Sequence, residues 1–168
     1  MKDLIEKIKP YDLLNNLFPG VVFVIVLGKI TNFDLSQKDV VSSVFFYYFS
    51  GMVISRFGSI VVEPILRKFI KFAKYDDYIT ASSIDPKIDD LSTVNNIYRT
   101  VVSTFIMLLV AKICSTVIEK YKFDLSVFGY SFLIVILILF IFSYIKQTRY
   151  VVSRVEKCMQ RKVSNEHN

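Results

Sequence analysis

The twelve residues Ser131–Phe142, SFLIVILILFIF, contain no charged side chain and form the centre of an apolar block that extends from Val127 to Ile145. Because an α-helix rises about 1.5 Å per residue, about 20 apolar residues cross a hydrocarbon core roughly 30 Å thick. Three further blocks of this kind lie at about 13–30, 40–62 and 100–118. A chain of 168 residues with four such blocks is not a soluble globule, a disordered chain or a disulfide-stapled secreted domain.

Lipid offers the backbone no hydrogen-bond partners, so each block is expected to form a helix that satisfies its own amide and carbonyl groups. The sequence therefore predicts an all-α polytopic membrane protein with four transmembrane helices in a single membrane domain, residues 1–168. Residues 63–99 are expected to form an amphipathic and acidic connector between the second and third helices. Residues 146–168 are expected to form a basic tail.

The 21 lysines and arginines are unevenly divided between the two sides of such a domain. The N-terminal segment holds three, the segment from Arg56 to Arg99 holds seven and the tail holds six, whereas the two opposite loops hold only Lys29, Lys38, Lys120 and Lys122. Loops that remain in the cytoplasm carry the excess of basic residues. We therefore expect both termini and the connector to be cytoplasmic and the protein to reside in the bacterial inner membrane.

A short internal repeat indicates a further level of organisation. The tetrapeptide FDLS occurs at residues 33–36 and again at 123–126, and both copies fall in the two loops expected outside the cell. The chain is then interpretable as two tandem helical hairpins of like orientation, as in some transporters. A chance match at two interfacial turns is the alternative interpretation.

Small residues in two of the spans indicate where helices pack closely, because they allow backbones to approach in lipid. The second span contains Gly51, Ser55 and Ser59 at intervals of four, and the third contains Ala111 and Ser115. These residues are expected to mediate either packing within the protein or contacts in a homo-oligomer. The fourth span has almost no small residues beyond its start and is expected to face lipid.

The first span opens with polar residues and a helix-breaking pair: Asp12, Asn15, Asn16, Pro19 and Gly20. Proline removes a backbone donor and kinks a helix. Two interpretations are open. The segment either enters the membrane with its polar groups at the headgroups, or presents a polar, hinged face to the bundle interior or to a partner.

Two basic residues, Arg56 and Lys112, fall inside spans. Ionisable residues at this depth are functional candidates by default. Both also lie close enough to a boundary for their flexible stems to reach the headgroups, which is the preferred interpretation. Arg56 is alternatively expected to pair with Glu63, two helical turns further on, or with an acid on another helix.

Basic residues alternate with apolar ones in the first part of the connector and in the tail. The segment 64–74, PILRKFIKFAK, predicts a short amphipathic helix that lies on anionic headgroups or continues the second span. The predicted headgroup contacts are Arg67, Lys68, Lys71, Lys74, Arg154, Lys157 and Arg161.

The connector is acidic between these basic segments. Asp85 and Pro86 are typical of a helix start, with aspartate as the N-cap and proline as the first helical residue. An apolar stripe then leads into the third span. Either this is a solvated helical connector, or it is a docking surface for a soluble partner, formed by Asp85, Asp89, Asp90, Asn95, Asn96 and Arg99.

The sequence contains no P-loop, no histidine-containing metal motif and no nucleophile elbow, and His167 is its only histidine. We therefore expect no catalytic residues, no metal site and no cofactor. Direct binding of nucleic acid is not expected, because the basic residues cluster at the ends of spans.

Three features of the chain resemble those of a known class of membrane proteins. They are the opening YDLLNNLFPG at residues 11–20, the four spans with both ends inside and the small charged cytoplasmic surface. They are similar to the small membrane components of bacterial anti-phage defence systems, nearest to the transmembrane subunit of the Kiwa system. The resemblance implies an inner-membrane oligomer that senses infection and holds a soluble DNA-binding partner at the membrane.

The function expected is that of a non-enzymatic homo-oligomer, in contact with the lipid bilayer, that senses a membrane event and recruits or gates a cytoplasmic protein. A second hypothesis is a small pore or transporter subunit, with the polar opening of the first span, Gly51 and Ser55 around its lumen. A third, a membrane-embedded enzyme, lacks a catalytic set.

Overall fold

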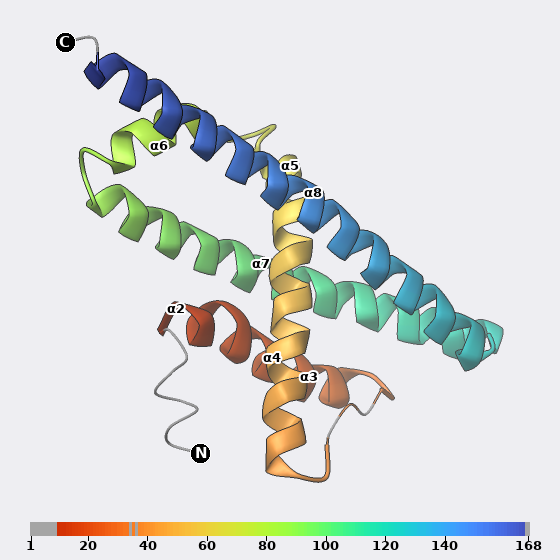
Figure 1. Ribbon diagram of the computed structural model, residues 1–168. Coiled ribbons are helices and arrows are strands. Elements are labelled where there is room, and N and C mark those ends of the chain that lie inside the picture. Colours follow the sequence, from red (N-terminus) through yellow and green to blue (C-terminus); the bar gives the residue numbers. More distant parts are fainter. Residues whose placement is uncertain (1–9, 34, 36, 167–168) are drawn as a thin grey trace.

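The computed structural model describes residues 10–33, 35 and 37–166 (Figure 1). The described residues contain helices and no strands. The helical elements are α2 (Pro10–Asp12), the π-helical segment η1 (Leu13–Leu17), α3 (Phe18–Ile30), α4 (Val40–Phe57), the π-helical segment η2 (Gly58–Val62), α5 (Glu63–Leu66), α6 (Tyr75–Ser82), α7 (Lys87–Tyr121) and α8 (Leu125–Glu166).

Four helical stretches in the described residues are long and apolar enough to cross a membrane. They are Leu13–Ile30, Val40–Leu66, Lys87–Tyr121 and Val127–Gln160. The prediction of an all-α, multi-pass membrane protein with four spanning helices is thereby confirmed. The last two helices are longer than expected, because the second half of the connector belongs to α7 and the tail belongs to α8.

Helix α4 is the element that joins the others. It packs against η1 and α3 on one side and also contacts α7 and α8. Figure 1 shows α4 crossing α3, α7 and α8. Helix α8 packs mainly against α4, η2 and α6. The close packing of α3 on α4 therefore has no equivalent between α7 and α8, and the proposed repeat of two like hairpins stays a prediction.

The two copies of the FDLS tetrapeptide lie at the loops that follow α3 and α7. Asp34 and Ser36 of the first copy lie outside the described residues. The ring of Phe33 stacks on that of Phe128 at a centroid distance of 5.9 Å. The stacked rings bring the first loop close to the start of α8.

Most side chains of α8 are exposed. Leu139 and Ser143 are its buried residues among those whose side chains are described. This exposure agrees with the expectation that the fourth span faces lipid, since lipid tails solvate apolar side chains as well as a protein interior does.

Helices η1, α3 and α4 pack with their backbones in direct contact. A methyl group added at Gly51 would overlap the carbonyl oxygen of Asn16, and one added at Gly20 would overlap the carbonyl oxygen of Tyr47. A third glycine, Gly58, lies against the Ser103 hydroxyl of α7. Glycine at these three positions therefore decides how closely α4 approaches the first and third spans.

Each π-helical segment ends two residues before a proline. Segment η1 precedes Pro19, and η2 precedes Pro64. Proline has no amide hydrogen and its ring crowds the carbonyl four residues earlier. The wider π-helical turn relieves this crowding, because the amide just before the proline bonds to the carbonyl five residues back: Phe18 to Leu13, and Glu63 to Gly58.

The prediction of an amphipathic helix over residues 64–74 is wrong. Helix α5 ends at Leu66, residues 67–69 form a turn and residues 70–74 are not helical. In a helix, Arg67 and Lys71 would be four residues apart and Lys68 and Lys71 three apart, which places like charges side by side and destabilises the helix. Glu63 instead holds the Arg67 side chain close to α5.

The starts of α4 and α7 are both capped by aspartate. Asp39 accepts a hydrogen bond from the Ser42 amide at 2.8 Å. Asp85 accepts one from the Lys87 amide at 3.0 Å, and α7 begins at Lys87, directly after Pro86. The helix start predicted at Asp85 and Pro86 is therefore confirmed to within one residue, and it lies well before the predicted third span.

We expect the G51A variant to lose about 1–3 kcal/mol of unfolding free energy, because the added methyl group must push η1 away from α4. The measurement is equilibrium unfolding of the purified protein in detergent micelles. G129A is the matched control, since nothing lies within 4 Å of a methyl group at that position of α8. Equal stabilities of G51A and G129A would contradict the packing described.

Candidate functional site

The Glu63 carboxylate lies among three cations that come from different parts of the chain. Its Oε1 accepts from Arg67 Nη2 at 2.8 Å, and its Oε2 accepts from Arg99 Nη1 at 2.6 Å and from Lys146 Nζ at 3.1 Å. Only 9% of the Glu63 side chain is exposed. This ion-pair cluster therefore joins α5, α7 and α8 through one buried carboxylate.

The position of Lys146 follows from the proline after Glu63. The Glu63 amide donates to the Gly58 carbonyl, five residues back. In the same π-helical pattern the amide of residue 64 would donate to the Ser59 carbonyl, but Pro64 has no amide hydrogen. Lys146 Nζ donates to this carbonyl and to the Ser59 hydroxyl, both at 2.8 Å. The Ser59 carbonyl, which Pro64 cannot satisfy, thus accepts a hydrogen bond that attaches α8 to η2.

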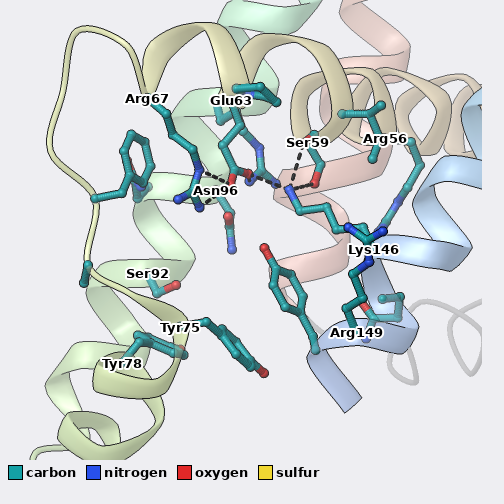
Figure 2. Close-up of a pocket in the computed structure, with 18 of the residues that line it drawn as sticks. Arg56, Ser59, Glu63, Arg67, Tyr75, Tyr78, Ser92, Asn96, Lys146 and Arg149 are labelled. Atoms are coloured by element: carbon teal, nitrogen blue, oxygen red, sulfur yellow. Dashed lines mark hydrogen bonds and ion pairs between the residues drawn. The ribbon is translucent and has the colours of Figure 1, made fainter. Parts of the chain in front are cut away.

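A cavity of about 940 Å³ lies beside this cluster and is called the basic cavity below. Figure 2 shows Glu63 with Arg67 on one side of it, Arg56, Lys146 and Arg149 on another, and the two tyrosines of α6 below. Its charged lining residues are Arg56, Glu63, Arg67, Arg99, Lys146 and Arg149. Five cations against one carboxylate leave this lining with a net charge of +4.

Helix α6 closes one wall of the basic cavity with aromatic rings. Tyr75 stacks on Tyr150 of α8 at a centroid distance of 4.4 Å. The Tyr78 hydroxyl donates to Asp89 of α7 at 2.6 Å. Burial, and then the bond to the Asp89 carboxylate, raise the pKa of Tyr78, so the phenol stays protonated at neutral pH. These contacts hold α6 against both α7 and α8.

A second polar cluster lies within the spans. Asn15 Nδ2 donates to Ser55 Oγ at 3.0 Å and to Asn16 Oδ1 at 3.2 Å, and Thr100 Oγ1 donates to Asn15 Oδ1 at 2.8 Å. All four residues are buried. The polar opening of the first span therefore faces the bundle interior and connects η1, α4 and α7.

The residues predicted to mediate helix packing have different surroundings. Gly51 and Ser55 are buried against η1, whereas Ser59 is half-buried and accepts from Lys146. On α7, Ala111 is half-buried, and buried Ser115 donates to Glu119 at 3.0 Å. The second-span residues thus act within one chain. In the pore hypothesis Gly51 and Ser55 would line a lumen, but here they are packed between helices.

The remaining residues of the first span also lie in the packed region. Pro19 and Gly20 are buried, and Asp12 is half-buried. Pro19 follows the π-helical segment η1, which is the local distortion expected of a proline in a span. The polar opening and the proline therefore form one interior feature of the bundle.

Of the six residues predicted to dock a partner, four are exposed: Asp85, Asp89, Asp90 and Asn95. Asp89 also accepts from Tyr78, and both Asn95 and Asn96 line the basic cavity. Arg99 pairs with Glu63. Arg99 does not belong to a docking surface, because its guanidinium is bound to a buried carboxylate.

The residues predicted to contact headgroups are mostly exposed, with one correction. Lys68, Lys71, Lys74 and Arg154 are exposed and Lys157 is half-buried, while the side chain of Arg161 lies outside the described ones. Arg67 instead binds Glu63 and lies over the Phe72 ring, 4.6 Å from its centroid.

The two basic residues inside spans differ in their placement. Lys112 is exposed on α7. Arg56 is half-buried and lines the basic cavity, and Glu63 bonds to other cations and not to it. The alternative expectation that Arg56 pairs with Glu63 is therefore wrong, because Arg67, four residues from Glu63, and the cations of α7 and α8 occupy its oxygens.

Sequence reasoning missed the central role of Glu63 and assigned Lys146 only to the charge count. One signal was present: Glu63 is an acid at the end of a span and directly precedes a proline.

The described residues contain no group of three or more histidine, cysteine, aspartate or glutamate side chains able to hold a metal ion.

We expect E63Q to lower the unfolding free energy by about 3 kcal/mol, because removing the carboxylate leaves three cations close together without their counter-charge. The measurement is unfolding by a denaturing detergent, followed by circular dichroism. E156Q removes an exposed acid from α8 and is expected to change stability by less than about 0.5 kcal/mol. A cluster that contributes nothing would give the two variants equal stability.

No family model, curated protein or solved structure matches this chain.

Proposed function

We propose that this protein is a non-enzymatic, homo-oligomeric component of the bacterial inner membrane that senses a membrane event and binds a soluble cytoplasmic protein. The four spanning helices and the excess of basic residues at the proposed cytoplasmic side support this location. The resemblance to the membrane subunits of defence systems favours a more specific role, in anti-phage defence.

The observation that carries the proposal is a stripe of exposed apolar residues on the first turns of α7. Leu91, Val94 and Tyr98 lie at intervals of three and four residues, so they share one face of the helix. Their exposed fractions are 69%, 45% and 67%. Polar side chains surround them, so at least Leu91 lies beyond the hydrocarbon region, where an exposed apolar stripe indicates a contact surface.

Charge indicates the chemistry of the partner. Asp85 and Asp90 are exposed beside the stripe, and Asp76 and Asp77 are exposed on the neighbouring α6. This docking surface, defined by Leu91, Val94, Tyr98, Asp85 and Asp90, fits a protein that presents basic residues around an apolar contact. Because acidic residues repel phosphate groups, the surface favours a protein over a nucleic acid.

We expect the double substitution D85N/D90K to release the soluble partner without disturbing membrane insertion, because it removes the negative charge of the docking surface. Asparagine at position 85 keeps a side-chain oxygen that accepts from the Lys87 amide at the start of α7. The tagged protein is extracted gently from native membranes in which its genomic neighbours are co-expressed, and the mass and composition of the complex are measured. E156K is the control, since Glu156 is exposed on α8, away from the docking surface.

The outcomes of this measurement separate the hypotheses. A homo-oligomer that retains one soluble protein with E156K and loses it with D85N/D90K supports the proposal. Retention of the partner by D85N/D90K contradicts the docking surface. A homo-oligomer without any soluble protein contradicts recruitment and favours the pore, for which ion leakage on expression is the next test.

The proposed orientation has its own test, which uses the native Cys158, exposed on the extension of α8. A membrane-impermeant maleimide is expected to label Cys158 in inverted vesicles and not in intact spheroplasts, because the basic tail is cytoplasmic. K122C/C158S, with its new cysteine after α7 and without the native one, should show the opposite pattern. Labelling of Cys158 in intact spheroplasts would reverse the orientation.

A further inference from the structure

We propose that the basic cavity binds a phosphate-bearing anion, either the headgroup of an anionic phospholipid or a soluble phosphate ester. The cavity is formed by α4, η2 and α5 together with α6, α7 and α8, and it has a volume of about 940 Å³. This inference does not depend on the proposed protein partner, because the docking surface and the cavity share few residues.

The charge of the lining requires a counter-ion. Glu63 is its one acidic residue, and three of the five cations already share that carboxylate. Like charges confined in a partly buried space repel one another, with less screening than at an open surface. An anion in the cavity would remove this repulsion.

Two arginines of the lining have free guanidinium groups. Arg56 and Arg149 make no hydrogen bond or ion pair within the part of the chain that the structure describes. Arg149 follows Lys146 of the ion-pair cluster by three residues, and Arg56 precedes Ser59, which accepts from Lys146, by three. Each arginine therefore shares a helix face with one partner of this contact. The planar fork of arginine matches two oxygens of a phosphate group.

A buried donor in the same lining also lacks an acceptor. Arg99 binds Glu63 through Nη1, but its Nε is buried without a hydrogen-bond partner. Unpaired buried donors are rare in folded proteins, and each costs free energy. Arg99 is the one such case among the described side chains, and the same residue lines the cavity.

The rest of the lining accommodates more than one phosphate group. Neutral donors are present in Ser92, Asn95 and Asn96, and the stacked rings of Tyr75 and Tyr150 form an aromatic wall. Asp85 and Asp90 do not line the cavity. Basic pockets between the ends of membrane helices are typical sites for anionic headgroups, while a soluble phosphate ester would use the same cations.

The test uses the full chain in nanodiscs of phosphatidylcholine, with binding of inorganic pyrophosphate measured by calorimetry. R56Q/R149Q removes the two free arginines without touching the ion-pair cluster. K68Q/K71Q is the matched control, because both lysines are exposed at the same end of the protein and neither lines the cavity. A second arm uses nanodiscs of equal parts phosphatidylcholine and phosphatidylglycerol, with retained lipid identified by native mass spectrometry.

We expect the dissociation constant for pyrophosphate to rise about tenfold or more in R56Q/R149Q and less than about twofold in K68Q/K71Q, as for the loss of charge-assisted hydrogen bonds. Such a result identifies a soluble phosphate. Retention of phosphatidylglycerol by the wild type and the control, with its loss in R56Q/R149Q, identifies the lipid headgroup. Absence of both kinds of binding, or equal binding by the two variants, overturns the proposal.

The E63Q variant provides a second measurement that a purely structural role of the arginines would not affect. It removes the one carboxylate of the cavity and should therefore bind pyrophosphate more tightly than the wild type, although it is less stable. Pyrophosphate is then expected to raise the midpoint of thermal unfolding more in E63Q than in the wild type. Weaker binding by E63Q would overturn the assignment of the phosphate to these cations.

Discussion

Pro64 is the constraint on which the contacts between η2, α5 and α8 around Glu63 depend. Because Pro64 has no amide hydrogen, the helix before it widens into η2, and the Ser59 carbonyl is left without a backbone donor. Lys146 supplies that donor and also binds Glu63, the residue next to Pro64. Helix α8 has few buried side chains, so this lysine adds a polar attachment to the aromatic contacts that α8 makes with Phe49 and Tyr75.

Polar contacts between helices occur at two depths in the bundle, and the two sets join different helices. Deep in the spans, Asn15 links η1 to Ser55 of α4 and Thr100 of α7. Near the ends of the spans, Glu63 links α5 to α7 and α8. Interhelical hydrogen bonds in membranes contribute about 0.6 kcal/mol each on average, so the Asn15 contacts specify which helices meet more than they determine total stability. The glycine contacts set the distance of approach.

The same arrangement separates two surfaces of opposite charge. Five cations, three of them paired with Glu63, line one cavity, while exposed aspartates lie on α6 and on the first turns of α7. Tyr78 connects the two regions through Asp89, and Tyr75 connects α6 to Tyr150. An anion in the basic cavity would contact α7 and the wall formed by α6. The proposed ligand site and the proposed docking surface therefore both include residues of α7, and Leu91 belongs to both.

The sequence by itself determined which segments are long and apolar enough to cross a membrane, that they are helical and that the fourth is the one whose side chains pack least against the others. These properties depend on the free energy of placing each segment's own side chains and backbone in hydrocarbon. Local chemistry also predicted the helix start at Asp85 and the inward packing of Gly51 and Ser55. The predicted amphipathic helix after Pro64 failed because clustered like charges and the pull of Glu63 on Arg67 outweighed its apolar periodicity.

Only the tertiary structure decided the candidate site. The partners of Glu63 lie 36 and 83 residues away in Arg99 and Lys146, and Arg56 and Arg149 come together in one cavity from different spans. A pattern along the chain cannot reveal such a group, because each cation alone is indistinguishable from a residue that extends to the headgroups. Their convergence follows from the crossing of α4 with α7 and α8, which the glycine contacts and the π-helical turn before Pro64 establish.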